Sequence, residues 1–166
     1  MAKGSKKEVK TNAMRILETL GIPFSHQEYE CDEFTGGSET ADKLGLDHGQ
    51  VFKTLVTTGA DKAHYVFVIP VDEELDLKKC ARSVGVKSVS MLPMKELFGL
   101  TGYVRGGCTA IGMKKQFVTR IHESAEAHPE IYVSAGKLGC QLKLSPDDFC
   151  RAARAEYADL IQEGNP

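Results

Sequence analysis

The first residue with chemical potential is a lysine inside an apolar run. Lys53 lies within residues 50–56 (QVFKTLV), whose other side chains are mostly of types that pack into a β-sheet. Such a lysine must extend to water, contact an anion or meet a ligand. A solvent-facing lysine is the ordinary outcome, but the aromatic and β-branched neighbours favour a pocket. There Lys53 and Thr54 would present a cation and a hydroxyl, suited to a phosphate or a polarised carbonyl.

A glycine-rich segment is the second candidate. Residues 99–107 contain four glycines in nine positions. The segment has two readings, either a tight connection between strands or a place where backbone N–H groups approach a ligand oxygen. It matches neither GxGxxG nor GxxxxGK[ST], so neither nucleotide-binding fold is expected. Residues 134–137 (SAGK) resemble half of a phosphate loop, which alone is a weak signal.

Motifs for covalent catalysis or metal binding are not found. The chain has no GxSxG, no HExxH and no CxxC, and its five cysteines are scattered. Residues 26–28 match H-x-E but lack the Pro-Cys-x-x-Cys that completes a zinc deaminase. We therefore predict no metal and no other cofactor. A pocket made from a lysine, small hydroxyls and glycine backbone would need its substrate to supply the nucleophile.

Length and composition describe an ordinary globular chain. Its 166 residues predict a single domain over residues 8–163, after a disordered leader at residues 1–7. The net charge of −2 argues against coating a nucleic acid such as DNA, but allows a local basic patch. No apolar run is long enough for a membrane span, and no signal core follows the basic N-terminus. We expect a cytoplasmic protein with reduced thiols.

Strands and helices alternate along the chain and must position these residues. Hydrophobic spacing and turn residues predict about five helices, at 9–20, 38–44, 77–84, 93–98 and 145–160. Expected N-caps are Thr11 or Asn12, Ser38, Asp76 and Ser145. About seven strands are expected, at 24–30, 51–56, 64–70, 86–91, 117–121, 131–134 and 140–144. The second and third should form a hairpin. The predicted fold class is one α/β domain.

Six segments in order carry a family resemblance. They are residues 10–15 (KTNAMR), 50–55 (QVFKTL), 74–79 (ELDLKK), 101–103 with 106–107 (TGY…GG), 112–115 (GMKK) and 131–137 (IYVSAGK). Together they resemble the bacterial YbaK/EbsC family, the free-standing Cys-tRNA(Pro) deacylases, over about residues 10–161. The resemblance implies a mixed, barrel-like β-sheet flanked by helices, related to the editing domain of bacterial prolyl-tRNA synthetases.

The resemblance also implies an activity. Cysteine and proline are close in size, so a synthetase pocket separates them poorly and a second sieve is needed. In that family the thiol of the substrate attacks its own ester carbonyl, releasing tRNA and a cyclic thiolactone. Such substrate-assisted cyclisation agrees with the missing nucleophile. Serine and alanine offer no comparable thiolate.

The implied site residues follow from matching positions. Lys53 matches the lysine that holds the terminal adenosine or its phosphate, and Thr54 follows it as in the family pattern. Tyr29 matches a tyrosine at the pocket edge. Gly106 and Gly107 match a pair whose backbone faces the aminoacyl ester. Ser134 and Gly136 match the opposite wall. The family pattern has an aspartate where this chain has Gln141, so the amino-acid specificity is less defined than the fold.

Two alternatives stay open. A deacylase could act on another misacylated tRNA, such as Ala-tRNA(Pro), through a positioned water, or the domain could be a non-catalytic module that binds tRNA or a synthetase. The small net charge predicts weak contact with the tRNA body, so affinity should come from the acceptor end. We expect prolyl-tRNA synthetase as a partner. The sequence does not determine the oligomeric state.

Overall fold

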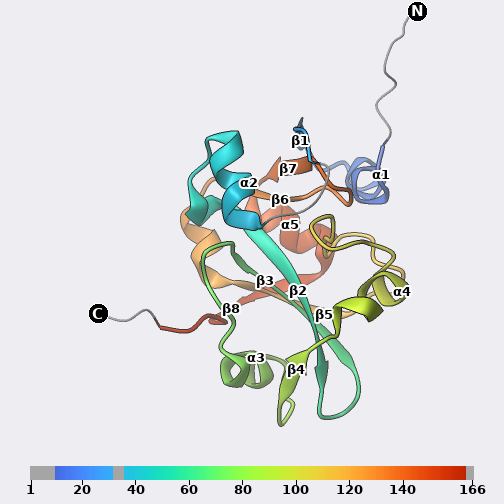
Figure 1. The fold of residues 1–166 in the computed structure, drawn as a ribbon, viewed down its shortest axis with the longest axis vertical. Coiled ribbons are helices and arrows are strands. Elements are labelled where there is room, and N and C mark those ends of the chain that lie inside the picture. The colour runs from blue at the N-terminus through green and yellow to red at the C-terminus, as the bar shows by residue number, and fades with distance from the viewer. Residues whose placement is uncertain (1–9, 32–35, 164–166) are drawn as a thin grey trace, which may run out of the picture.

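The computed structural model describes residues 10–31 and 36–163 (Figure 1). Its α-helices are α1 (Asn12–Thr19), α2 (Gly37–Leu44), α3 (Leu77–Val84), α4 (Leu97–Thr101) and α5 (Pro146–Ala153). Short 3-10 helices are η1 (His48–Gln50), η2 (Met94–Glu96) and η3 (Glu123–Ala127). The strands are β1 (Ser25–Glu28), β2 (Phe52–Gly59), β3 (His64–Pro70), β4 (Val89–Met91), β5 (Val118–His122), β6 (Ile131–Ser134), β7 (Cys140–Leu144) and β8 (Ala155–Ala158). The leader expected at residues 1–7 lies outside the described residues.

The strands form two sheets. A three-stranded antiparallel sheet has the order β1-β7-β6, and a five-stranded mixed sheet has the order β4-β2-β3-β5-β8. In Figure 1 the smaller sheet lies at the top, above the larger one. An isolated parallel bridge between Val51 and Tyr132 joins them. The predicted α/β class is therefore confirmed. The sheet that the resemblance implied to be barrel-like is not closed as a barrel, because the strands make two separate sheets.

Hydrophobic cores cover both faces of the larger sheet. Alternate residues of β3 face opposite ways. Val66 belongs to the main core with Phe149 of α5, whereas Phe67 packs in a second core with Cys80 of α3. All four side chains are fully buried. Burying a side chain as large as Phe67 contributes about 1.5–3 kcal/mol, so apolar contact helps to hold α3 on the sheet.

Several helix ends follow their sequence signals. The Thr11 hydroxyl accepts a hydrogen bond from Met14 N, and the Asp76 side chain accepts from Lys78 N and Lys79 N in α3. Ser145 caps α5 in the same way. Gly45 and Gly85 end their helices in the left-handed conformation, which costs glycine little. The predicted β2–β3 hairpin is also confirmed.

Other boundaries differ because contacts distant in sequence decide them. Helix α2 begins after Gly36, and Ser38 donates to Asp72 instead of capping it. The helix expected to reach residue 160 ends where Arg154 adopts a left-handed conformation, and Tyr157 then lies in β8, paired with β5. The strands expected at 24–30 and 86–91 are shorter, and the helix expected at 93–98 is replaced by η2 and α4. Within the described residues, no helix is long and apolar enough to cross a membrane.

Candidate functional site

The site lies where strand β2 has an open edge. At one end Val51 bridges to β6, and at the other Thr57–Gly59 pair with β4. Among the described residues, no strand pairs with residues 52–55 on this edge. Val56 O accepts from Leu92 N on the β4 side. Because backbone groups alternate sides along a strand, the N–H and C=O of Thr54 point the same way, into the gap.

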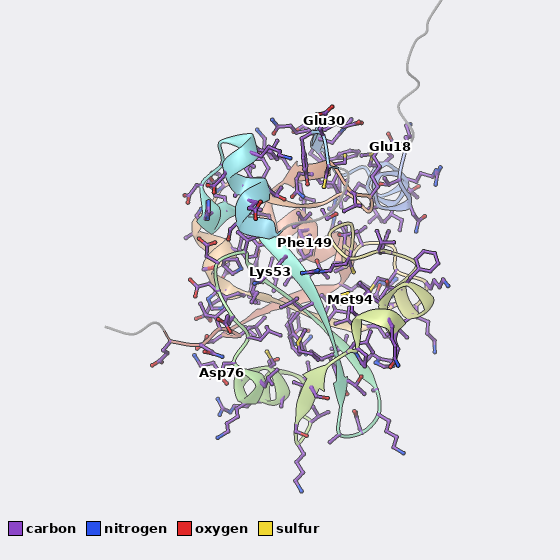
Figure 2. The ribbon with its side chains drawn as sticks, in the orientation of Figure 1. Glu18, Glu30, Lys53, Asp76, Met94 and Phe149 are labelled. Atoms are coloured by element: carbon purple, nitrogen blue, oxygen red, sulfur yellow. The ribbon has the colours of Figure 1, made fainter. Side chains whose placement is uncertain are left out.

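A cavity of about 340 Å³ occupies this gap, a size suited to a small ligand or one end of a larger one. Its walls come from β2, the start of α2, the β4–α4 segment, the glycine-rich loop and the smaller sheet. The lining residues are Gly36, Gly37, Thr40, Val51–Val56, Val71, Met91, Leu92, Met94, Leu97, Arg105, Gly106, Cys108, Ser134 and Gln141. Figure 2 shows Lys53 near the middle of the molecule, between α2 and the segment that carries Met94.

Lys53 is a partly buried cation in the wall of the cavity. Burial lowers the pKa of its ammonium group, and the negative charges of Glu74, Asp72 and Glu73 offset part of that effect. Within the described residues, no carboxylate forms an ion pair with its Nζ. A partly desolvated ammonium gains more from a bound anion than one in open water does. Lys53 is therefore prepared to bind a negatively charged group.

Four of the predicted site residues meet in this cavity: Lys53, Thr54, Gly106 and Ser134. Gly106 adopts φ +84°, a conformation that favours glycine. Ser134 Oγ lies 3.4 Å from Gly106 O, to which it donates, and 3.4 Å from Gly136 N, from which it accepts. The hydroxyl of Ser134 thus ties the glycine-rich loop to the β6–β7 turn.

Three predicted site residues do not line the cavity: Tyr29, Gly107 and Gly136. A Cβ on Gly107 would lie 3.0 Å from the backbone of Lys137. Gly136 has φ +103°, and a Cβ there would lie 3.0 Å from the Tyr103 ring. These two glycines let the loop and the turn approach each other. Tyr29 lies beyond β1, where its N–H donates to Gly139 O at 2.9 Å.

Sequence reasoning missed several lining residues, and Gln141 is the most informative. In the sequence it stands out only as a departure from the family pattern. Gln141 is 6% exposed, lies opposite Ser134 in the β6–β7 pair, and its Oε1 has no hydrogen-bond partner within the described residues. A buried acceptor without a partner is costly and suggests that a ligand or water completes it. The available signal was a polar residue between Cys140 and Leu142, both fully buried.

The other missed residues define the charge and reactivity of the site. Cys108 is buried in the wall, and burial raises the pKa of its thiol to about 12. It therefore remains a neutral thiol near pH 7. Arg105 adds an exposed cation at the rim. The described lining residues include no histidine and no carboxylate. The described lining residues can thus hold an anionic or carbonyl-bearing group, and they include no nucleophile–base pair.

A histidine between two carboxylates anchors α2 beside the cavity. His48 Nε2 lies 2.7 Å from Asp42 Oδ1, and His48 Nδ1 lies 2.7 Å from Asp72 Oδ2. Hydrogen bonds to Asp42 and Asp72 raise the pKa of His48. The hydrogen bond from Ser38, with a smaller effect from His48, lowers the pKa of Asp72. This network links α2, whose first residue Gly37 lines the cavity, to the segment after β3.

Comparison with known proteins gives consistent results. The family model of the aminoacyl-tRNA editing domain matches residues 34–152. The chain is 45% identical over 161 residues to EbsC of Enterococcus faecalis (strain ATCC 700802 / V583), which is described as a candidate Cys-tRNA(Pro)/Cys-tRNA(Cys) deacylase. That alignment covers 96% of this chain and 98% of EbsC.

Solved structures agree. The crystal structure of a candidate trans-editing enzyme for prolyl-tRNA synthetase superposes with a TM-score of 0.80 at 26% identity, over 94% of this chain and all of the other. A crystal structure of a hypothetical protein superposes with a TM-score of 0.82 over 92% of this chain and all of the other. At 22% identity, this second likeness concerns the fold alone.

Proposed function

The chain belongs to the aminoacyl-tRNA editing domain family, and from that premise we propose that it removes cysteine from misacylated Cys-tRNA(Pro). The relationship to EbsC, at 45% identity over nearly the full length of both chains, supports this substrate. The size of the cavity suits an aminoacylated 3′ terminus, which is small and can unstack from the acceptor stem. The tRNA body would remain outside.

The composition of the cavity is the observation that carries the mechanism. The described lining residues offer cations and one neutral thiol, but no histidine or carboxylate to activate a water or a side chain. A substrate that contains its own nucleophile needs neither. The cysteinyl thiolate would attack the ester carbonyl, forming a C–S bond. The C–O bond to the ribose then breaks, and the ribose oxygen takes the proton that the thiol lost.

Cations at the site favour this reaction. A positive charge near a thiol stabilises the thiolate, so Lys53 and Arg105 would increase the fraction of the reactive form. In the proposed complex Lys53 also holds the terminal phosphate or adenosine. The open backbone groups of Thr54 and the loop at Gly106 would orient the ester. Each of these residues positions the substrate, and none becomes covalently bonded to it.

Exposed apolar side chains near the cavity suit unstacked bases. Met91 and Met94 belong to the lining and are 48% and 58% exposed, and Phe98 of α4 is 58% exposed. Lys114 Nζ lies 5.6 Å from the centre of the Phe98 ring. An aromatic ring beside a cation is a favourable surface for single-stranded nucleic acid. We infer that the penultimate nucleotides of the acceptor end cross this surface.

A blocked substrate tests the mechanism. Purified protein should deacylate Cys-tRNA(Pro) but leave S-methylcysteinyl-tRNA(Pro) intact, because cyclisation requires a free thiol whereas hydrolysis does not. Thiolactone or its trapped adduct should appear in step with released tRNA. Equal rates on both substrates would show that the ester is hydrolysed instead. If no aminoacyl-tRNA were turned over, the protein would be a non-catalytic binding module.

One observation favours a second substrate class. The Oε1 of Gln141, which has no hydrogen-bond partner within the described residues, could hold a water against the ester, and that water would hydrolyse another misacylated tRNA, such as Ala-tRNA(Pro). Replacing Gln141 with leucine should then abolish turnover of Ala-tRNA(Pro), while cyclisation of Cys-tRNA(Pro) should survive. Measuring both substrates with both proteins separates the two mechanisms.

Prolyl-tRNA synthetase is the proposed partner. The structural relative is described as a candidate trans-editing enzyme for that synthetase, and this chain carries a net charge of −2, which gives little general attraction to tRNA. A complex with the synthetase would supply the missing affinity and selectivity. Gel filtration of the protein with synthetase and tRNA(Pro) should show co-migration, and separate elution of all three would contradict the proposal.

A further inference from the structure

We propose that this protein has a binding site for a zinc-like divalent metal ion, formed by His26, Glu28 and Cys140. The three residues lie at the margin of the smaller sheet. In the antiparallel β1–β7 pair, Glu28 is directly opposite Cys140. His26 is two residues before Glu28, so its side chain lies on the same face. Strand pairing thus gathers three different donor groups.

The donor atoms are close enough for one ion to reach all of them. One ligand atom from each residue lies within 4.8 Å of the other two. His26 Nδ1 and Cys140 Sγ are 3.9 Å apart. Tetrahedral zinc, with bonds of about 2.1 Å to nitrogen and 2.3 Å to sulfur, requires about 3.6 Å between those atoms. A shift of a few tenths of an ångström would complete the geometry.

The donor chemistry selects the class of metal. A thiolate and an imidazole favour zinc or a similar transition metal over magnesium and calcium, which prefer oxygen ligands. Glu28 adds a carboxylate from the exposed side, and water can fill the fourth position. Within the described residues, this carboxylate makes one loose contact, 3.8 Å from Lys137 Nζ, and both side chains are at least one-third exposed. Such a contact contributes little and would yield to an ion.

Linear spacing could not reveal this site. His26 and Cys140 are 114 positions apart, and H-x-E alone matches no metal motif. The expectation of no metal rested on the absence of such spacings. A neutral thiol resting against an imidazole is the ordinary alternative for His26 and Cys140, and a direct binding measurement separates it from a metal site.

A bound ion would stabilise one wall of the cavity from the opposite face of the smaller sheet. Gln141 follows Cys140 in β7, and its side chain lies on the opposite face, where it lines the cavity. An ion that joined β1 to β7 would fix this wall and would release Lys137 in the β6–β7 turn. The site is nevertheless separate from the editing mechanism, so metal binding can be tested without any tRNA.

Cobalt titration gives the decisive readout. Full-length protein freed of metal with a chelator is titrated with Co²⁺, and thiolate coordination is followed by the ligand-to-metal charge-transfer band. Native mass spectrometry with Zn²⁺ measures the stoichiometry. We expect one ion per chain. The charge-transfer band should disappear in Cys140→Ser, and affinity should fall at least about tenfold in His26→Gln, since even outer-shell changes often cost that much.

Cys150→Ser is the matched control. Cys150 is a partly buried cysteine of α5 that does not belong to the cluster. This variant should keep both the band and the affinity of the unaltered protein. Circular dichroism checks folding, and if Cys140→Ser does not fold, His26→Gln decides. Absence of a band at saturating Co²⁺, a band that survives in Cys140→Ser, or unchanged affinity in His26→Gln would overturn the proposal.

Discussion

Replacing Lys53 with glutamine removes a positive charge from the wall of the cavity and keeps a polar, somewhat shorter side chain. A full charge pair 4 Å apart is worth about 4 kcal/mol at an effective dielectric constant of 20. Lys53 is only partly buried, so screening should reduce its interaction with a phosphate or thiolate to about 1.5–3 kcal/mol. Because 1.4 kcal/mol is a factor of ten, kcat/KM for Cys-tRNA(Pro) should fall about 10–150-fold.

Folding should not be harmed by this change. Burial lowers the pKa of Lys53, which means that the folded protein disfavours its charge near neutral pH. Urea unfolding of Lys53→Gln should therefore show equal or slightly greater stability. The assay is single-turnover deacylation of Cys-tRNA(Pro) at fixed salt, with exposed Lys87→Gln as the matched loss of charge.

A conservative variant separates charge from shape. Lys53→Arg keeps the cation and should retain more activity than Lys53→Gln, although the larger guanidinium will fit the cavity less well. The reasoning is refuted if Lys53→Gln lowers kcat/KM less than threefold, or if Lys87→Gln lowers it as much. Equal losses in the arginine and glutamine variants would mean that shape, not charge, is what matters at this position.

Three further predictions concern the surroundings of the cavity. NMR titration should place the pKa of His48 above 6.5, and Asp72→Asn should lower this pKa. Because folding raises the pKa, the stability that protonated His48 contributes is complete below pH 6.5, and it is lost as the pH rises through the folded-state pKa. Gly107→Ala should destabilise the protein by about 1–3 kcal/mol in urea unfolding, because the added Cβ would lie 3.0 Å from backbone atoms of Lys137. The control Gly99→Ala in α4 adds a Cβ with no atom within 4 Å and should be neutral or stabilising. Phe98→Ala should raise KM for Cys-tRNA(Pro) about fivefold or more, because it removes a stacking surface, and thermal stability should stay unchanged because Phe98 is 58% exposed. An unchanged KM would mean that the acceptor end binds elsewhere.

Local signals predicted the fold well where the deciding interactions are local. Thr11, Asp76 and Ser145 cap helices because their side chains reach backbone N–H groups two or three residues away. Ser38 has the same chemistry, but its hydroxyl bonds to Asp72, 34 positions later. Tyr157 fits a helical face as well as a strand, and pairing with β5 decides for the strand. Distant partners of this kind leave no trace in local spacing.

The site was predictable to a similar extent. Lys53 and Thr54 could be found because a polar pair interrupts an apolar strand, and Gly106 and Ser134 through the family resemblance. The gap could not be predicted, because it arises between the bridge of Val51 to β6 and the pairing of Thr57–Gly59 with β4. Cys108 and Gln141 resemble ordinary buried residues in the sequence. Only the position of that gap makes them part of a cavity.

An unpaired strand edge is also a hazard for a protein in a crowded cell. Exposed N–H and C=O groups invite a strand from another molecule, the first step of many aggregation pathways. In β2 the open stretch comprises residues 52–55, closed at one end by the bridge to β6 and at the other by β4. At about 3.3 Å per residue it is only about 13 Å long, shorter than a typical strand of five or six residues. The same window that leaves backbone groups free for a small ligand is thus too short to seed sheet growth.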